Sequence, residues 1–221
     1  MTRRVVELAG PAGAGKTTLV TVLLSRDPEA ILGVDVGRLR LAAGLASAVP
    51  MSVAARASAP GRWWTEAELR SLAYLRAWRG ALADRDDDGL VLLDHGPVFR
   101  LAALAAYGPP MVHTTAFRRW WTSTARSWAT TLDAVFWLDA PDEVLLGRVE
   151  GRARRHRLRG VGQVAAGEFL DRYRDAYAEA LDHVAAAGTP VVRLDTSTDT
   201  RDALADAIET SLADAVSRRS A

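Results

Sequence analysis

Short apolar runs and longer amphipathic segments alternate along the chain. Five runs have the length and the aliphatic composition of strands, and they cover residues 4–9, 30–35, 90–94, 134–139 and 190–195. The run at 90–94 is apolar up to its terminal aspartate, as in a strand that is covered on both faces. The alternation of strands with helices predicts an α/β fold, with a five-stranded parallel sheet flanked by helices in three layers.

Apolar residues recur with helical spacing in the segments between these runs. The clearest helix starts at a capping box formed by Thr65 and Glu68 and continues to about residue 83. Further helices are predicted at residues 18–25, 39–47, 97–107, 113–131 and 163–187, from residue 141 onwards, and around Leu204, Ile208, Leu212 and Val216. Residues 50–61 contain small side chains and prolines without a clear period, which predicts a mobile connection.

The loop after the first strand reads Gly10-Pro11-Ala12-Gly13-Ala14-Gly15-Lys16-Thr17 and fits the phosphate-binding pattern G-x-x-x-x-G-K-[ST] at every fixed position. Glycines let backbone N–H groups turn towards a polyphosphate, and the following helix adds the positive end of its dipole. We expect Lys16 to reach the terminal phosphates and the Thr17 hydroxyl to ligate Mg²⁺. The nucleotide-binding residues expected here are Gly10, Ala12, Gly13, Ala14, Gly15, Lys16, Thr17 and Thr18.

Lys16 is the only lysine among the 28 lysine and arginine residues of the chain. A compact ammonium on a flexible stem fits a nest of backbone amides better than a planar guanidinium does. All other residues of this group are arginine, so the single lysine stands at the position where phosphate binding needs one. An accidental match of a glycine-rich turn to the pattern is the alternative, and the strand and helix that flank the loop argue against it.

Composition excludes several classes of protein. No cysteine is present, so disulfides, thiolate metal sites and cysteine nucleophiles are excluded. A net charge of +1 argues against a general binder of nucleic acid or of membrane surfaces. The first residues lack the apolar segment of a signal peptide, and no apolar run approaches the ~18 residues of a membrane span, so we expect a soluble cytoplasmic protein. The length of 221 residues suits a single domain, residues 1–221.

Aspartates end the four strands that follow the first: Asp35, Asp94, Asp139 and Asp195. Ligands of an open parallel sheet bind beyond the carboxyl ends of its strands. Asp94 is the candidate ligand of Mg²⁺, because the third strand of such a fold usually lies beside the first. Asp35 could take a proton from the acceptor hydroxyl or hold it in line, with a helix cap or a turn as the alternative. Asp139 is expected to cap the next helix, and Asp195 to lie in a turn.

Six arginines and one glutamate occur at residues 147–160, and Arg148, Arg152, Arg155 and Arg159 share one stripe of a helix. Such a concentration of like charge favours contact with a nucleotide polyphosphate, with a solvated face of paired arginines as the alternative.

The tryptophans at 120, 121, 128 and 137 are expected in the core. Trp63 and Trp64 are adjacent and cannot both point inwards, so one of them could stack on the acceptor or seal it from water.

Three stretches resemble the P-loop kinases of nucleotides, nucleosides and other small molecules. They are the loop at 10–17, L-V-L-L-D-H-G-P-V-F-R at 90–100, and W-L-D-A-P-D-E-V-L-L-G-R-V-E-G-R-A-R-R at 137–155. The second is similar to a strand end of nucleoside monophosphate kinases, which implies that Asp94 serves Mg²⁺ and that Arg100 meets the acceptor. The third is similar to their fourth strand, helix and lid. It implies an arginine-rich lid at 147–162, in which Arg148 stacks on the base while Arg152 and Arg155 neutralise the transferring phosphoryl group.

The segment I-L-G-V-D-V-G-R-L at 31–39 resembles the second-strand end of antibiotic phosphotransferases of the chloramphenicol type, and more loosely that of shikimate kinase. In those enzymes an aspartate contacts the acceptor hydroxyl, which favours Asp35 as the base and brings Arg38 towards the acceptor. Asp94-His95-Gly96 departs from the D-R-[YSH] or E-R-S triplet of thymidylate and deoxynucleoside kinases. The missing arginine weakens the case for a thymidylate or deoxynucleoside acceptor.

Together these features predict a P-loop NTPase fold and an enzyme that uses ATP and Mg²⁺. It would move the γ-phosphoryl group to a hydroxyl or phosphate of a small molecule, such as a nucleoside, a nucleotide or an antibiotic-like metabolite. The expected catalytic residues are Lys16, Asp35, Asp94 and Arg152. Acceptor binding is expected from Asp35, Arg38, Trp63 and Arg100, with residues 36–89 as a helical insertion on the acceptor side.

Other classes of nucleotide-binding protein fit the sequence less well. A GTPase would need a base-reading N-K-x-D segment, which a chain with Lys16 as its only lysine lacks. No L-S-G-G-Q-like signature of a transport ATPase is present. A non-catalytic or hydrolytic nucleotide-binding protein remains the alternative.

Overall fold

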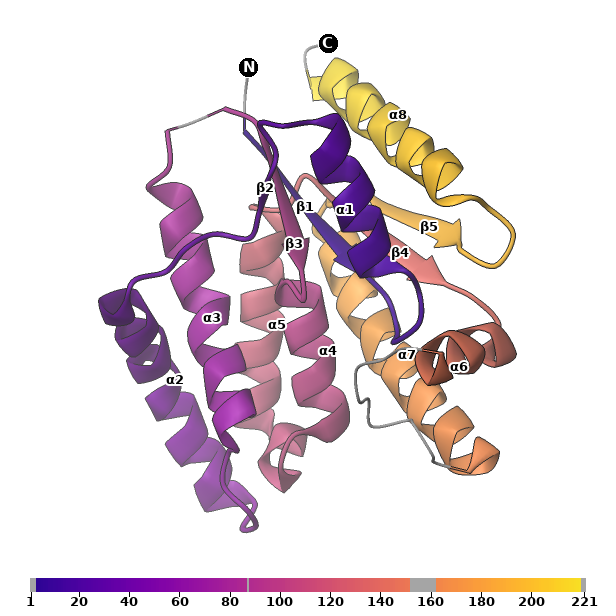
Figure 1. Ribbon diagram of the computed structural model, residues 1–221. Helices are drawn as coiled ribbons and strands as arrows, with labels where there is room; N and C mark the ends of the chain where they lie inside the picture. Colours follow the sequence, from indigo (N-terminus) through magenta and orange to yellow (C-terminus); the bar gives the residue numbers. More distant parts are fainter. Residues whose placement is uncertain (1–2, 87, 152–161, 220–221) are drawn as a thin grey trace.

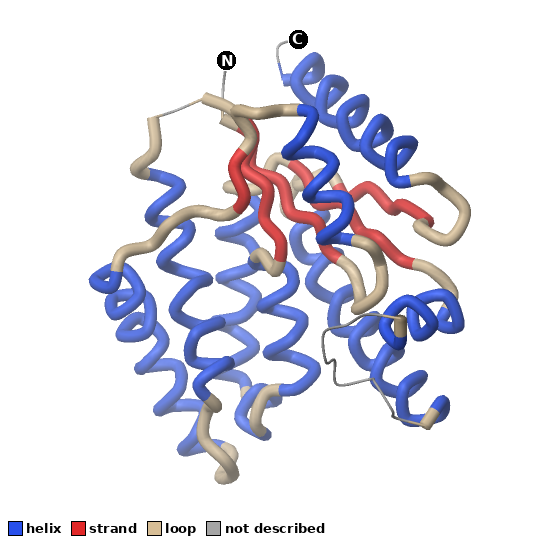
Figure 2. Tube along the Cα trace, in the orientation of Figure 1, coloured by secondary structure: helices blue, strands red, loops and turns tan. Residues whose placement is uncertain are grey.

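The parallel sheet predicted from the sequence is present. The computed structural model describes residues 3–86, 88–151 and 162–219. The strands in this part of the chain are β1 (Arg4–Ala9), β2 (Ile31–Leu32), β3 (Leu90–Asp94), β4 (Ala134–Asp139) and β5 (Val191–Asp195). They form one sheet, which is drawn in red in Figure 2. The order of its five strands is β2-β3-β1-β4-β5, and every neighbouring pair is parallel. Strand β1 is central, and the segment that follows it therefore emerges in the middle of the carboxyl edge.

Helices cover both faces of the sheet. They are α1 (Lys16–Arg26), α2 (Arg38–Ser58), α3 (Glu66–Ala83), α4 (Pro97–Tyr107), α5 (Thr115–Ala129), α6 (Asp142–Glu150), α7 (Gln163–Ala186) and α8 (Arg201–Arg219), with a short 3₁₀ helix at Pro110–His113. Helices α1 and α8 lie on one face, and α3, α4, α5 and α7 lie on the other (Figure 1). Side chains of β1 alternate between these two faces. Val6 and Leu8 pack in the hydrophobic cluster under α1 and α8, whereas Val5 and Ala9 pack in the cluster under α3, α4, α5 and α7.

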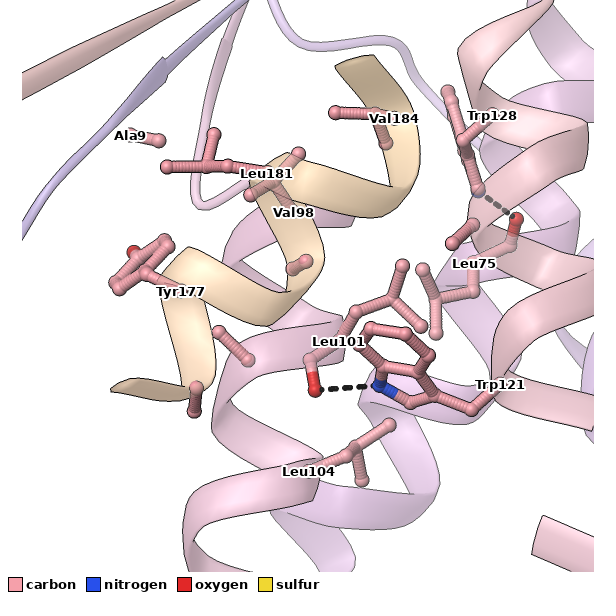
Figure 3. Packing of buried hydrophobic residues seen from close by; sticks show 14 of the residues in the cluster. Ala9, Leu75, Val98, Leu101, Leu104, Trp121, Trp128, Tyr177, Leu181 and Val184 are labelled. Carbon is pink, nitrogen blue, oxygen red and sulfur yellow. Dashed lines mark hydrogen bonds between the residues drawn. The ribbon is translucent and has the colours of Figure 1, made fainter. Parts of the chain in front are cut away.

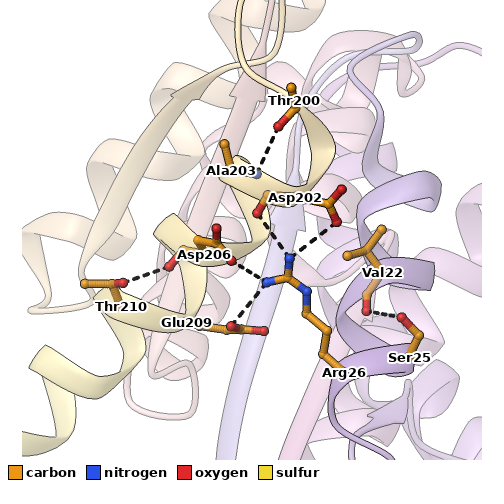
Figure 4. Close-up of polar contacts among 9 residues, drawn as sticks. All are labelled: Val22, Ser25, Arg26, Thr200, Asp202, Ala203, Asp206, Glu209 and Thr210. Atoms are coloured by element: carbon orange, nitrogen blue, oxygen red, sulfur yellow. Dashed lines mark hydrogen bonds and ion pairs between the residues drawn. The ribbon is translucent and has the colours of Figure 1, made fainter.

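An arginine on α1 connects the two helices of the smaller face. The Arg26 guanidinium donates to the carboxylates of Asp206 (2.6 Å), Glu209 (3.3 Å) and Asp202 (3.3 Å), all on α8 (Figure 4). The three acids are half-exposed or more, so each pair contributes little by itself. Convergence of three carboxylates on one guanidinium fixes where α8 crosses α1.

Two tryptophans of α5 anchor the larger face. Trp121 and Trp128 are fully buried, and their indole N–H groups donate to the carbonyls of Leu101 (3.0 Å) and Leu75 (2.8 Å) (Figure 3). Each ring therefore buries its apolar area without leaving a polar atom unpaired. Trp137 is also buried, whereas Trp120 is partly buried against the same cluster. Of the adjacent pair, Trp64 is buried and Trp63 is 45% exposed.

The prediction of a mobile connection at residues 50–61 is wrong. Helix α2 continues through Pro50 to Ser58, and Pro50 lies on its exposed side. The buried stripe of α2 consists of Gly44, Ala48, Met51, Ser52 and Ala55, whose mostly small side chains gave no strong apolar period. Small size is what this interface needs, because a Cβ on Gly44 would lie 2.3 Å from the Ala73 carbonyl oxygen of α3.

Length and composition alone would allow α2 to cross a membrane. In this fold one side of α2 packs along α3. A single apolar helix of this kind does not indicate a membrane protein.

Two predicted details at the carboxyl edge also differ. Strand β2 ends at Leu32 rather than at residue 35, because Gly33 adopts a positive φ of 70° and turns the chain. Asp139 does not cap the helix after it, since Pro141 occupies the N-cap position of α6. Asp195 does lie in a turn, where its carboxylate accepts from the backbone N–H of Ser197 (2.7 Å). Most of the predicted lid at 147–162 lies outside the described residues.

Candidate active site

The loop between β1 and α1 has a backbone that only glycine allows at several positions. Gly10, Gly13 and Gly15 have φ values of 150°, 90° and 85°. A Cβ on Gly10 would lie 2.2 Å from the Leu138 carbonyl oxygen of β4, and a Cβ on Gly13 would lie 2.5 Å from the Leu145 carbonyl oxygen of α6. The loop is therefore pressed against two neighbouring elements, which fix its shape.

The Lys16 ammonium folds back over this loop. Its Nζ donates to the carbonyl oxygens of Gly10 (2.6 Å) and Pro11 (2.9 Å). The Gly10 carbonyl also accepts from the hydroxyl of Tyr177 on α7 (3.4 Å). Burial raises the pKa of Tyr177 well above its usual value, which keeps this hydroxyl protonated as a donor. The ammonium is thus held at the start of the loop, where it lines an open cavity.

Asp94 ends β3 directly beside the loop, since it pairs in register with Leu8 of β1. Its side chain is 16% exposed, and its Oδ1 lies 3.4 Å from Nδ1 of His95. Within the described residues this buried oxygen has no hydrogen-bond donor. His95 has a positive φ of 59°, and burial lowers its pKa despite the opposing charge of Asp94. The neutral imidazole is therefore favoured beside the carboxylate.

The donor set at this edge fits a magnesium ion that arrives with a nucleotide. The described residues contain no cluster of three or more His, Asp or Glu side chains that could hold a metal alone. Asp94 instead offers a buried carboxylate oxygen without a donor, and Thr17 is an exposed hydroxyl in the first turn of α1. Mg²⁺ is commonly held by one or two protein oxygens, with phosphates and water completing its shell.

A cavity of about 450 Å³ opens beside Lys16 between the loop and helices α3, α4 and α7. Four aromatic residues form one wall: Phe99, Tyr107, Phe169 and Tyr173. Tyr107 stacks on Phe169 with 5.0 Å between ring centroids and 17° between planes, and Phe169 lies 5.8 Å and 12° from Tyr173. The Tyr107 hydroxyl donates to the Phe169 carbonyl (3.0 Å), which connects α4 to α7. Three rings of this wall are therefore nearly parallel, whereas Phe99 meets Tyr173 edge-on at 67°.

Charged side chains form another part of the cavity wall. Arg62 and Glu68 form a bidentate ion pair with N–O distances of 2.8 and 2.7 Å, and Arg62 also donates to the Tyr107 carbonyl (2.9 Å). Glu68 accepts from the backbone N–H of Thr65 (2.7 Å) and completes the predicted capping box. Burial acts to raise the pKa of Glu68, but its hydrogen bonds outweigh this and lower it. Sequence reasoning identified Glu68 only as a cap and did not identify Arg62 at all.

Glu7 is the buried acid that sequence reasoning missed. It lies in the middle of β1, is fully buried, and accepts from the backbone N–H groups of Val98 (2.8 Å) and Phe99 (2.9 Å) in the first turn of α4. A Cβ on Gly96 would lie 2.6 Å from its Cδ. Burial raises the pKa of Glu7 to about 7, although the two backbone N–H groups act in the opposite direction. Glu7 thus fixes the junction between Asp94 and α4.

Arg148 lies on the other side of the phosphate loop. Its guanidinium donates to the Gly13 carbonyl (3.4 Å) and to the carbonyl of Thr196 (2.6 Å). It lines a second cavity of about 330 Å³ together with the loop, Thr18 and α8. The other two predicted lid residues, Arg152 and Arg155, lie outside the described residues.

Arg100 lies over two adjacent aromatic rings. Its Cζ lies 4.6 Å from the ring centroids of both Tyr74 and Trp78, and its Nη1 donates to the Ser71 hydroxyl (3.3 Å). Burial lowers the pKa of Arg100 to about 10. Ser71 lines the cavity of about 450 Å³, whereas Arg100 reaches that cavity only through Ser71.

The remaining predicted acceptor residues do not contribute to the lining of this cavity. Asp35 and Arg38 are exposed, and Trp63 is 45% exposed. None of the three lines the cavity beside Lys16. Their roles stay predictions.

Comparison with known proteins supports the fold. The sequence matches no family model and no curated protein. Among solved structures, the chain is similar to a deoxyadenosine kinase from M. mycoides with dCMP and a flexible dCDP bound, with a TM-score of 0.54 and 12% identity over 95% of this chain and 99% of that one. The same kinase with dATP bound gives a TM-score of 0.54 and 14% identity over 94% and 98% of the two chains. The chain therefore has the fold of a P-loop kinase.

Proposed function

We propose that this protein is an ATP-dependent kinase that moves the γ-phosphoryl group to a hydroxyl or phosphate of a small, planar acceptor. The observation that carries the proposal is the position of Lys16, whose ammonium lines a cavity with an aromatic and a polar wall. A site for nucleotide phosphates and a site for a second small molecule therefore meet at one side chain. Similarity to solved kinases supports the proposal at the level of fold.

On the nucleotide side, the glycine-rich loop would present its backbone N–H groups to the phosphates. Lys16 would exchange the carbonyls of Gly10 and Pro11 for phosphate oxygens. Arg148 would meet the nucleoside part of ATP from the cavity on the far side of the loop. When bound, Mg²⁺ would neutralise charge on the β- and γ-phosphates, with Thr17 and Asp94 as its protein ligands.

On the acceptor side, the parallel rings of Tyr107, Phe169 and Tyr173 suit a flat molecule that can stack on them. Glu68 and Arg62, which line the same cavity, offer a charged acceptor and charged donors. A nucleoside, a nucleotide or an aromatic antibiotic meets these requirements.

Phosphoryl transfer depends mainly on positioning and on electrostatic stabilisation, so it needs no strong base. His95 lines the cavity beside Lys16 and contacts Asp94, which makes this pair a candidate to orient the acceptor hydroxyl. Asp35 is the other candidate base. An Asp35→Asn variant with unchanged turnover would leave Asp94 and His95 as the groups that act at the hydroxyl.

A screen for phosphate transfer tests this function. Nucleosides, nucleotides and hydroxylated antibiotics are incubated with ATP and Mg²⁺, and ADP release is measured with and without each compound. The expected result is ADP release that depends on an acceptor, together with a product heavier by one phosphoryl group. ADP release that no compound stimulates would favour a hydrolytic protein, and tight ATP binding without turnover would favour a non-catalytic one.

A further inference from the structure

A long groove lies over α2, α3 and α5, away from the site described above. It consists of three hollows of about 670, 210 and 670 Å³. Arg79 lines all three, Arg76 lines two, and Ser127 and Thr130 each line two. These shared residues make the hollows one continuous surface, which we call the arginine groove.

The arginine groove lies at the opposite edge of the sheet from Lys16. One end of it is lined by Arg3 and Asp133, which directly precede β1 and β4. Lys16 and Asp94 follow the carboxyl ends of β1 and β3. A ligand in the groove could therefore be bound while the phosphate loop holds a nucleotide.

Charge in the groove is poorly balanced by the described residues. Asp133 is the only carboxylate that lines any of the three hollows, and it accepts the backbone N–H of Val5 (2.7 Å). Of the seven arginines that line the groove, Arg40 pairs with Asp84, Arg118 pairs with Glu179, and Arg3 donates to the Arg85 carbonyl. The other four arginines have no ion pair or hydrogen bond to the part of the chain that is described: Arg76, Arg79, Arg119 and Arg126. Four unpaired guanidinium groups on one surface repel one another until an anion neutralises them.

Side-chain chemistry in the groove matches phosphate. A guanidinium presents a fork of N–H donors that fits two oxygens of one phosphate, and exposed hydroxyls add single hydrogen bonds. Ser123 and Thr130 are exposed and Thr122 is partly buried, and all three place hydroxyls between the arginines. The groove extends through three hollows, so several phosphates in a row fit it better than a single ion does.

The aromatic residues of the groove favour a chain of phosphates over a nucleic acid, because their rings are not available to stack on bases. Trp120 and Trp128 line the middle hollow, but Trp128 belongs to the core and Trp120 is partly buried against it. Trp128 is fully buried with its indole N–H bonded to Leu75, and Trp120 packs on Phe117 with 5.5 Å between ring centroids. Single-stranded nucleic acid is usually bound on exposed aromatic rings that stack with its bases. We propose that the arginine groove binds a linear polyphosphate.

The test measures binding of short linear inorganic polyphosphate to the full chain by titration calorimetry. It is made both in the parent protein and in a Lys16→Ala variant, so that the phosphate loop cannot account for the result. The groove is altered by Arg79→Gln with Arg126→Gln, which keeps most of each side chain. The control, Arg172→Gln with Arg193→Gln, removes the same charge at exposed positions outside the groove. We expect the groove variant to bind about tenfold more weakly or worse, and the control to bind like the parent.

Several outcomes would overturn the proposal. Equal weakening in the control would mean that net charge alone attracts polyphosphate. If Lys16→Ala loses binding while the groove variant still binds like the parent, the polyphosphate binds in the phosphate loop. Competition by single-stranded DNA with the same number of phosphates, at equal or lower concentration, would make nucleic acid the ligand class. If the double variant loses its circular dichroism spectrum, the single variant Arg119→Gln decides, because Arg119 is exposed and has no ion pair or hydrogen bond to the described residues.

Discussion

The two sides of the candidate site are built in different ways. The proposed nucleotide side is formed by backbone, because the positive φ angles of Gly10, Gly13 and Gly15 and the close approach to β4 and α6 set its shape. The proposed acceptor side is lined by side chains of α3, α4 and α7, among them Glu68 and Tyr107, which lie far apart in the chain. A backbone-built site tolerates few substitutions, whereas a wall of side chains can be exchanged residue by residue. For the proposed kinase, this difference means that acceptor choice can change while nucleotide handling stays the same.

Removing the ammonium should have the largest effect. We expect Lys16→Ala to lower turnover of the phosphorylated acceptor by at least about 100-fold, because an electrostatic partner of the transferring group is lost. ADP release coupled to product detection measures this. Arg193→Gln, which removes an exposed positive charge on β5, is the control and should behave like the parent. Parent-like turnover of Lys16→Ala would show that the loop does not carry the chemistry.

Glu7 connects the two sides, since it lies in β1 and holds the first turn of α4. Its pKa rises from 4.5 to about 7 on folding. The folded state therefore binds more protons between these values, and Glu7 makes the protein less stable as pH rises through that window, by on the order of 3 kcal/mol in total. Below the window the carboxyl is protonated in both states, and above it the penalty is constant.

Glu7→Gln should remove this part of the pH dependence. Urea unfolding of parent and variant at several pH values from about 4 to about 8 gives the difference in unfolding free energy at each pH. We expect the parent to lose stability relative to the variant as pH rises. A difference that does not change with pH would mean that the Glu7 carboxyl titrates normally.

The backbone of the loop can be tested with one methyl group. Gly13→Ala should cost on the order of 2 kcal/mol of stability and weaken ATP binding, because the Cβ would lie 2.5 Å from the Leu145 carbonyl oxygen at a φ of 90°. Gly188→Ala is the matched control, because Gly188 has a φ of 100° but open space around its Cβ position. Thermal unfolding and ATP titration of both variants separate the steric clash with Leu145 from the backbone strain of a positive φ. Equal effects would show that φ alone matters.

Changes in the aromatic wall should have smaller and more selective effects. We expect Phe169→Leu to raise KM for the acceptor by about tenfold while KM for ATP stays unchanged, since a stacking surface is lost. Val164→Ala on the same helix removes an apolar group that is 79% exposed and should change neither constant. A rise in both KM values for Phe169→Leu would mean that the ring supports the whole site rather than the acceptor.

Much of the fold follows from local sequence, and the candidate site follows only in part. Strands β1, β3 and β4 and the loop at 10–17 have strong local signals, because buried parallel strands are apolar throughout and the loop needs glycines at fixed spacing. The sequence pattern does not predict that helix α2 continues through Pro50, since its interface with α3 uses small residues that carry little hydrophobic signal. The role of Arg62 depends on the distant Tyr107 carbonyl, which no local pattern encodes.

Glu7 could have been found from the sequence. It is the one acid inside the apolar run R-V-V-E-L-A, and a carboxylate in the central strand of a sheet must have partners or be neutral. Its partners, the N–H groups of α4, come from a segment 91 and 92 residues further along the chain. The need for partners was therefore visible, although their identity was not.

The solitary lysine gives this protein an unusual handle. Apart from the terminal amine, Lys16 is the only primary amine in the chain, and its nitrogen is held by two carbonyls of its own loop. An acylating reagent that prefers amines would therefore report on this one position, and its reaction rate would measure how often the nitrogen leaves those carbonyls. Any anion that covers the nitrogen would slow the labelling, so occupancy could be read by mass spectrometry without knowing the acceptor.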